Sequence, residues 1–113
     1  MLDFLLLAPE PLSLEDLSSR LVEKGWTVKR ARLDRIVVSL EDSDYVAIEK
    51  ADDSRHEFDP SEWNEVITRV DSPRIFYFKY LSRPLVGRVL RDIAAPGMFV
   101  DENDRLLEIG EFR

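Results

Sequence analysis

The chain has 113 residues, a formal net charge of −7 and no cysteine. This length suits a single domain, over residues 1–113, with a hydrophobic core of its own. The lack of cysteine excludes structural disulfides, zinc–thiolate sites and thiol catalysis. The longest apolar run, residues 4–8, is too short to cross a bilayer, and Asp3 stands where a secretory signal would have basic residues. We therefore expect a cytoplasmic protein.

The first expected elements are a strand and a helix. Residues 2–8 form a continuous apolar run, which predicts a buried strand. A helix over residues 14–24 should follow, because Ser13 and Asp16 have the spacing of a capping box and Gly25 suits the residue after the helix end. The positions expected to form its buried stripe are Leu14, Leu17, Leu21 and Val22.

Three strands are expected next, over residues 26–31, 35–40 and 45–49. Each has one apolar face, and short polar turns join them, which is typical of an antiparallel meander whose other face can remain in water. Four basic residues gather around the first turn: Lys29, Arg30, Arg32 and Arg35. They indicate either a solvated sheet edge that discourages strand addition or a spot that touches phosphate.

A charged loop over residues 50–59 leads to another helix. Asp59 is expected to cap it, with Pro60 in its first turn and Glu62 at the capping-box position. Phe58 and Trp63 are spaced to pack together across the helix start. The stripe expected to dock on the rest of the domain is Trp63, Val66, Ile67 and Val70.

Residues 74–81 then predict a central strand, because alternate side chains on both of its faces are largely apolar. Ser82 caps the following helix, and the Pro96–Gly97 pair ends it. Short strands at 98–100 and 106–109 close the chain. This order of elements predicts an α+β fold: a mixed, largely antiparallel sheet of about five to seven strands with three helices packed on it.

Residues that would support catalysis or cofactor binding are sparse. The glycines do not form a nucleotide-binding pattern, and His56 is the only histidine. The turn at residues 101–104 begins like a calcium loop, but no later position completes its ligand set. We expect no enzyme activity, no cofactor and no metal. A small hydrolase that uses clustered carboxylates is the remaining catalytic alternative.

The negative charge is concentrated in one segment. Residues 41–62 contain nine acidic residues against Lys50 and Arg55, whereas acidic and basic residues balance on either side. An acidic patch can steer a basic partner, and a solvated loop that keeps the protein soluble is the other interpretation. An acidic chain offers phosphate no overall attraction, so direct nucleic-acid binding is not expected.

The last third of the chain carries a recognisable series of motifs. An aromatic strand at 76–80 leads into a helix at 85–93, a short hydrophobic strand at 98–100, an acidic turn at 101–104 and a Gly-x-Phe ending at 110–112. This series resembles small bacterial immunity proteins of polymorphic-toxin and contact-dependent growth inhibition systems. The resemblance implies a protein without catalytic residues that neutralises a cognate toxin by covering an essential surface, and many nuclease toxins are basic.

Together the charge and the resemblance predict a partner-binding surface in the acidic segment. Its carboxylates would speed association with a basic toxin, and its aromatic side chains would anchor the complex. The candidate residues are Glu41, Asp42, Asp44, Tyr45, Asp52, Asp53, Glu57, Phe58 and Asp59. The alternative is an acidic regulatory or adaptor protein that docks another basic protein. We expect no membrane partner, and a monomer or a weak homodimer through the meander edge.

Overall fold

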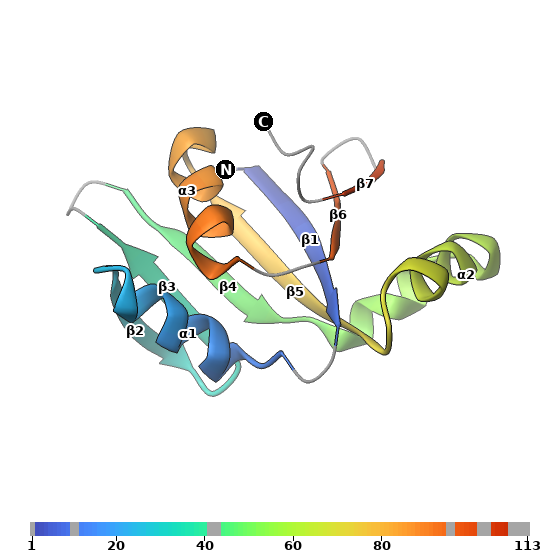
Figure 1. Ribbon diagram of the computed structural model, residues 1–113, viewed down its shortest axis with the longest axis horizontal. Coiled ribbons are helices and arrows are strands. Elements are labelled where there is room, and N and C mark those ends of the chain that lie inside the picture. The colour runs from blue at the N-terminus through green and yellow to red at the C-terminus, as the bar shows by residue number, and fades with distance from the viewer. Residues whose placement is uncertain (1, 10–11, 41–43, 95–96, 102–104, 109–113) are drawn as a thin grey trace.

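The computed structural model describes residues 2–9, 12–40, 44–94, 97–101 and 105–108, and these residues form one antiparallel sheet of seven strands with helices packed on it (Figure 1). The strands are β1 (Leu2–Pro9), β2 (Thr27–Arg32), β3 (Arg35–Ser39), β4 (Val46–Lys50), β5 (Pro73–Tyr80), β6 (Met98–Val100) and β7 (Leu106–Glu108). They lie in the order β2-β3-β4-β5-β1-β6-β7. The helices are α1 (Leu14–Glu23), α2 (Pro60–Arg69), α3 (Arg83–Ile93) and the short 3₁₀ helix η1 (Asp52–Glu57). The predicted α+β class is confirmed.

Local side-chain chemistry sets where the helices begin. The Ser13 hydroxyl accepts a hydrogen bond from the backbone N–H of Asp16 (3.1 Å), and the Asp16 carboxylate accepts one from the N–H of Ser13 (2.9 Å). Asp59 and Glu62 form the same reciprocal pair at the start of α2. Each capping box satisfies two N–H groups that otherwise lack partners. Both predicted capping boxes are confirmed.

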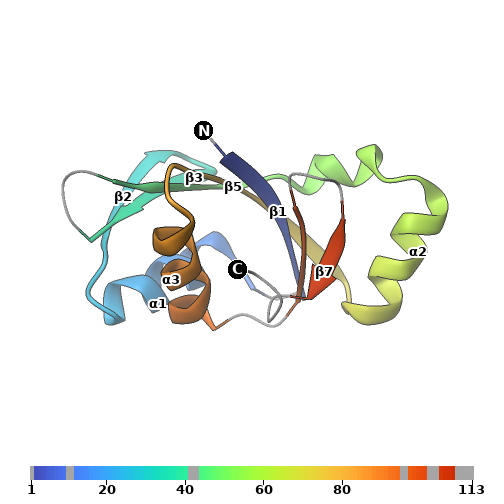
Figure 2. The ribbon, with the colours of Figure 1, turned by 90° about the horizontal axis from the view of Figure 1, so that it is seen from above.

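The two faces of the sheet are covered by different helices. Helices α1 and α3 lie side by side on one face, whereas α2 stands at the far end of the molecule (Figures 1 and 2). Side chains buried in the larger core, under α1 and α3, include Phe4, Leu6, Leu17, Leu21, Ile36, Val38, Ile48, Phe78, Val89 and Ile93. The smaller core, under α2 on the opposite face, is formed by Leu7, Val66, Val70, Ile75 and Met98.

Strand β5 lies at the middle of the sheet, between β4 and β1, but it is covered less completely than its sequence indicates. Phe76, Phe78 and Tyr80 are buried in the larger core. On the other face only Ile75 is buried, because α2 reaches no further along the strand, and Tyr77 remains partly exposed. The expectation of cover on both faces therefore holds only at the start of β5.

Three further expectations need correction. Val22 is 57% exposed and Ile67 is 48% exposed, because α1 and α2 each bury a stripe narrower than their apolar spacing indicates. The expected loop at 50–59 contains η1. This helix is held to the sheet, since Ala51 N–H donates to the Ile75 carbonyl (2.9 Å) and Ile75 N–H donates to the Asp52 carboxylate (3.1 Å).

Strand β2 forms one edge of the sheet, and two of its three basic residues have partners on their own chain. Arg30 binds Glu15 of α1 (3.1 Å), and Arg32 binds Glu49 of β4. This arrangement fits the interpretation of these cations as part of a solvated edge. None of the described helices is long and apolar enough to cross a membrane.

Candidate partner-binding groove

Helix α2 touches the sheet mainly through Val66 and Val70, and a groove opens beside it. The groove consists of two cavities of about 330 and 740 Å³ that share the lining residues Leu5, Glu57 and Val100. One wall is formed by η1 and α2, and the floor is formed by β5, β1, β6 and β7. We call this feature the acidic groove. Its volume lies in the range of sites that bind ligands or partner side chains.

The floor of the acidic groove is a row of side chains that crosses four neighbouring strands. Tyr77 of β5 lies opposite Leu5 of β1, Leu5 lies opposite Val100 of β6, and Val100 lies opposite Leu106 of β7. Residues directly opposite in an antiparallel sheet point to the same face. Each of the four is only partly buried, so the row presents apolar surface to the groove.

The helical wall carries carboxylates. Glu57 ends η1, and Glu62 and Glu65 lie three residues apart on α2, so they project from one side of that helix. All three are exposed. The rings of Phe58 and Trp63 pack together with centroids 5.6 Å apart, as their spacing predicts, and hold the junction between η1 and α2 in place.

The smaller cavity is the more polar part of the groove. The Tyr77 hydroxyl donates a hydrogen bond of 2.6 Å to Oδ2 of Asp3. Burial, reinforced by this bond and by the Asp3 charge, raises the pKa of Tyr77 to about 12. The phenol therefore stays protonated near neutral pH, where it acts as a fixed donor and not as a base.

Arg105 is the basic residue in the described lining, and its charge is already matched. Its backbone N–H, Nε and Nη2 donate to the Asp101 carboxylate at 2.9, 3.1 and 3.0 Å. Asp3, Glu57 and Glu62 add negative charge, whereas Glu65 is paired with Arg69 of α2 (3.3 Å). No three described His, Cys, Asp or Glu residues come together as a metal site. The arrangement is suited to holding a cationic group beside apolar side chains.

Two of the predicted partner-binding residues, Glu57 and Phe58, line the acidic groove. Asp59 and Asp52 lie nearby, but the first caps α2 and the second binds the Ile75 N–H. Asp53 is exposed on η1 and does not line either cavity.

The remaining predicted residues do not join this group. Asp44 and Tyr45 lie at the opposite end of β4, where Asp44 accepts from the Tyr45 N–H (2.8 Å). A five-residue strand spans roughly 16 Å, so the described acidic residues do not form one continuous patch. Glu41 and Asp42 lie outside the described residues.

Sequence reasoning missed the groove residues that come from the strands. Asp3, Leu5, Tyr77, Val100 and Leu106 are local parts of apolar strands, and only the order of the sheet brings them together. The available signal was the alternation in β5, where the hydroxyl of Tyr77 indicates a face that is not wholly buried.

Function has to be inferred from this groove and the charge around it. No family model matches the chain, and neither a curated protein nor a solved structure matches it.

Proposed function

We propose that the protein is a non-catalytic immunity protein that binds and neutralises a cognate toxin domain with a basic, nuclease-type surface. The observation that carries this proposal is the acidic groove, in which the carboxylates of Glu57, Glu62 and Glu65 stand beside the apolar floor of Leu5 and Val100. Interfaces of this composition bind through the apolar centre and select partners through the charged rim.

The distribution of charge supports a basic partner. Two of the three carboxylates on the groove wall, Glu57 and Glu62, come from the segment at 41–62 that holds the whole excess of negative charge in the chain, and Glu65 lies just beyond it. Charges near an interface raise the rate of encounter with an oppositely charged protein, and the effect weakens as salt is added. The partner should therefore associate quickly at low ionic strength.

The resemblance to immunity proteins supports immunity over a regulatory adaptor function. The part of the chain that carries it includes β5, β6 and β7, which supply Tyr77, Val100 and Leu106 to the groove floor. An immunity protein needs a surface that one toxin recognises tightly. A regulatory adaptor would instead bind several basic proteins with lower affinity.

The test begins with capture of partner proteins from the source cell. The gene of each captured protein is then expressed in an unrelated host, and growth of that host is measured. We expect one stoichiometric partner that arrests growth alone and is harmless when this protein is co-expressed. A set of weak partners that never arrest growth would contradict immunity and favour the adaptor function.

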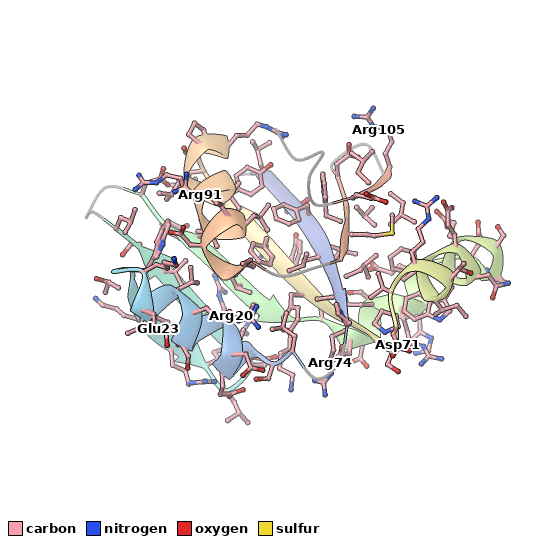
Figure 3. All side chains as sticks on the ribbon, in the orientation of Figure 1. Arg20, Glu23, Asp71, Arg74, Arg91 and Arg105 are labelled. Carbon is pink, nitrogen blue, oxygen red and sulfur yellow. The ribbon has the colours of Figure 1, made fainter. Side chains whose placement is uncertain are left out.

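Two matched variants link that phenotype to the groove. The groove variant is Glu57→Gln/Glu62→Gln/Glu65→Gln, in which glutamine keeps an acceptor for the capping bond of residue 62. The comparison variant, Glu23→Gln/Asp34→Asn/Asp71→Asn, removes the same number of charges at exposed positions outside the groove. Figure 3 shows Glu23 on α1, across the molecule from Arg105. The groove variant should protect growth less well than the comparison variant.

A further inference from the structure

The two cavities of the acidic groove differ in character, and this difference restricts what can fill them. The polar lining of the smaller cavity comes from Asp3, Ser54, Glu57, Tyr77 and Asp101, beside the apolar Phe4, Leu5 and Val100, so this cavity offers more polar than apolar surface. The larger cavity adds the apolar side chains of Phe58 and Leu106. An occupant that matches both must place a polar group in one cavity and apolar side chains in the other.

The carboxylates of the smaller cavity determine that the polar group of the occupant is positively charged. Asp3 receives the Tyr77 hydroxyl on Oδ2, which leaves Oδ1 to accept another hydrogen bond. Within the described residues the Glu57 carboxylate has no ion-pair partner. A lysine or arginine side chain would supply donors to both, whereas an acidic side chain would be repelled.

A second copy of this chain is a poor occupant. On its basic edge strand β2, two of the three cations, Arg30 and Arg32, are already bound to Glu15 and Glu49. Two chains that each carry a net charge of −7 also repel one another as they approach.

We infer that the acidic groove binds a basic amphipathic segment of the partner. A lysine or arginine of that segment enters the smaller cavity between Asp3 and Glu57, and its apolar side chains cover Leu5, Val100 and Leu106. The inference rests on the proposed function for the existence of a protein partner, and it deepens that function by naming the chemistry of the bound segment.

Model peptides test the inference without the natural partner. The probe is a fluorescein-labelled 14-residue peptide with leucine at i, i+3, i+4 and i+7 and lysine elsewhere. One control peptide replaces lysine with glutamate, and the other replaces leucine with serine. We expect saturable binding of the leucine–lysine peptide alone, measured by fluorescence anisotropy. Equal binding of the serine–lysine peptide would overturn the inference, because charge alone would then suffice.

The protein variants locate the binding. The groove variant should bind the leucine–lysine peptide about tenfold more weakly than wild type, and the comparison variant should stay within about twofold. Leu106→Ser, a substitution at a partly buried floor position, should also weaken binding. Amide shift changes on adding peptide should concentrate at Leu5, Tyr77, Val100 and Leu106. Shift changes confined to another surface would overturn the inference.

The same experiments would also reveal two other occupants of the acidic groove, a second copy of the chain or a segment of the chain itself. Self-association in sedimentation that the groove variant abolishes would assign the groove to a second copy. Peptide binding only after removal of residues 109–113 would assign it to the chain itself. If a toxic partner bound wild type and the groove variant equally, the inference would fail while the proposed function would stand. If the leucine–lysine peptide bound the groove but no toxic partner existed, the proposed function would fail alone.

Discussion

Gly97 precedes β6 at a point where the chain passes directly against β1. Its φ is +141°, and a Cβ built on it would lie 2.1 Å from the Leu7 carbonyl oxygen. Backbone atoms cannot yield as the end of a side chain can. Glycine is therefore required here by space as well as by conformation.

Gly97→Ala should lower the free energy of unfolding by about 3 kcal/mol or more, since it combines backbone strain with a steric clash. Gly25→Ala is the matched comparison, because Gly25 also has a positive φ (+92°) but has open space around it. It should cost only about 1 kcal/mol. Urea unfolding of both variants measures the difference, and equal losses would contradict the clash.

The Asp59 carboxylate makes the stability of the fold depend on pH in the acidic range. The backbone N–H of Glu62, helped by the Ser61 hydroxyl, holds the pKa of Asp59 below its ordinary value of 3.8. A carboxyl whose pKa is lowered by folding stabilises the protein above its unfolded pKa and loses this effect as pH falls through the folded pKa.

Asp59→Asn should keep the cap and remove the titration, because an asparagine oxygen can accept the same hydrogen bonds. The Tm of wild type and variant is compared from pH 6 down to about pH 2.5. The difference in Tm between them should shrink below about pH 4. A difference that stays constant with pH would mean that the Asp59 carboxylate does not titrate with folding.

At the scale of elements, the contact between Trp26 and Asp92 joins the entry to β2 with the end of α3. The indole N–H of Trp26, a residue only 3% exposed, donates to the Asp92 carboxylate at 2.8 Å. Nearby, Nη1 of Arg20 donates to the Ile93 carbonyl at 2.8 Å, and Figure 3 shows Arg20 on α1. The Arg20 bond joins α1 directly to α3, and the Trp26 bond joins the segment after α1 to α3, so both hold this side of the larger core together.

Trp26→Phe should lower the free energy of unfolding by about 2 kcal/mol, the typical value of a hydrogen bond to a charged group. The Trp26 bond is also the main cause that lowers the pKa of Asp92. Carboxyl titration by NMR should therefore show the pKa of Asp92 rising in the variant. An unchanged pKa would assign the lowering to Arg91 instead.

Most individual elements follow from the sequence because their signals are local. The capping pairs of α1 and α2 and the apolar run of β1 each lie within a few residues, and all three elements form where expected. The errors concern exposure. Val22 and Ile67 continue a helical apolar spacing, but burial depends on how much of each helix meets the sheet, which sequence spacing does not contain.

At the scale of the whole molecule, the groove depends on contacts between distant parts of the chain. Strand β1 comes first in sequence but lies between β5 and β6 in the sheet. This order places Leu5 next to Val100 and opposite Tyr77. The acidic segment includes Glu57 and Phe58, which line the groove, whereas the strand residues that form its floor could not be found without the sheet order.

The charge of the whole molecule predicts a kinetic effect. Association with a basic partner should slow on the order of tenfold between low and high salt, because ions screen the attraction that speeds encounter. Dissociation should change much less, since the apolar contacts hold the complex once it has formed. Stopped-flow mixing at several salt concentrations measures both rates, and an association rate independent of salt would contradict steering.

Calorimetry of the captured partner with three proteins, wild type, the groove variant and the comparison variant, would show whether the acidic groove is the binding surface. We expect the groove variant, with Glu57, Glu62 and Glu65 neutralised, to bind about tenfold more weakly and the comparison variant to stay close to wild type. Equal affinity of all three proteins would show that the acidic groove is not the binding surface.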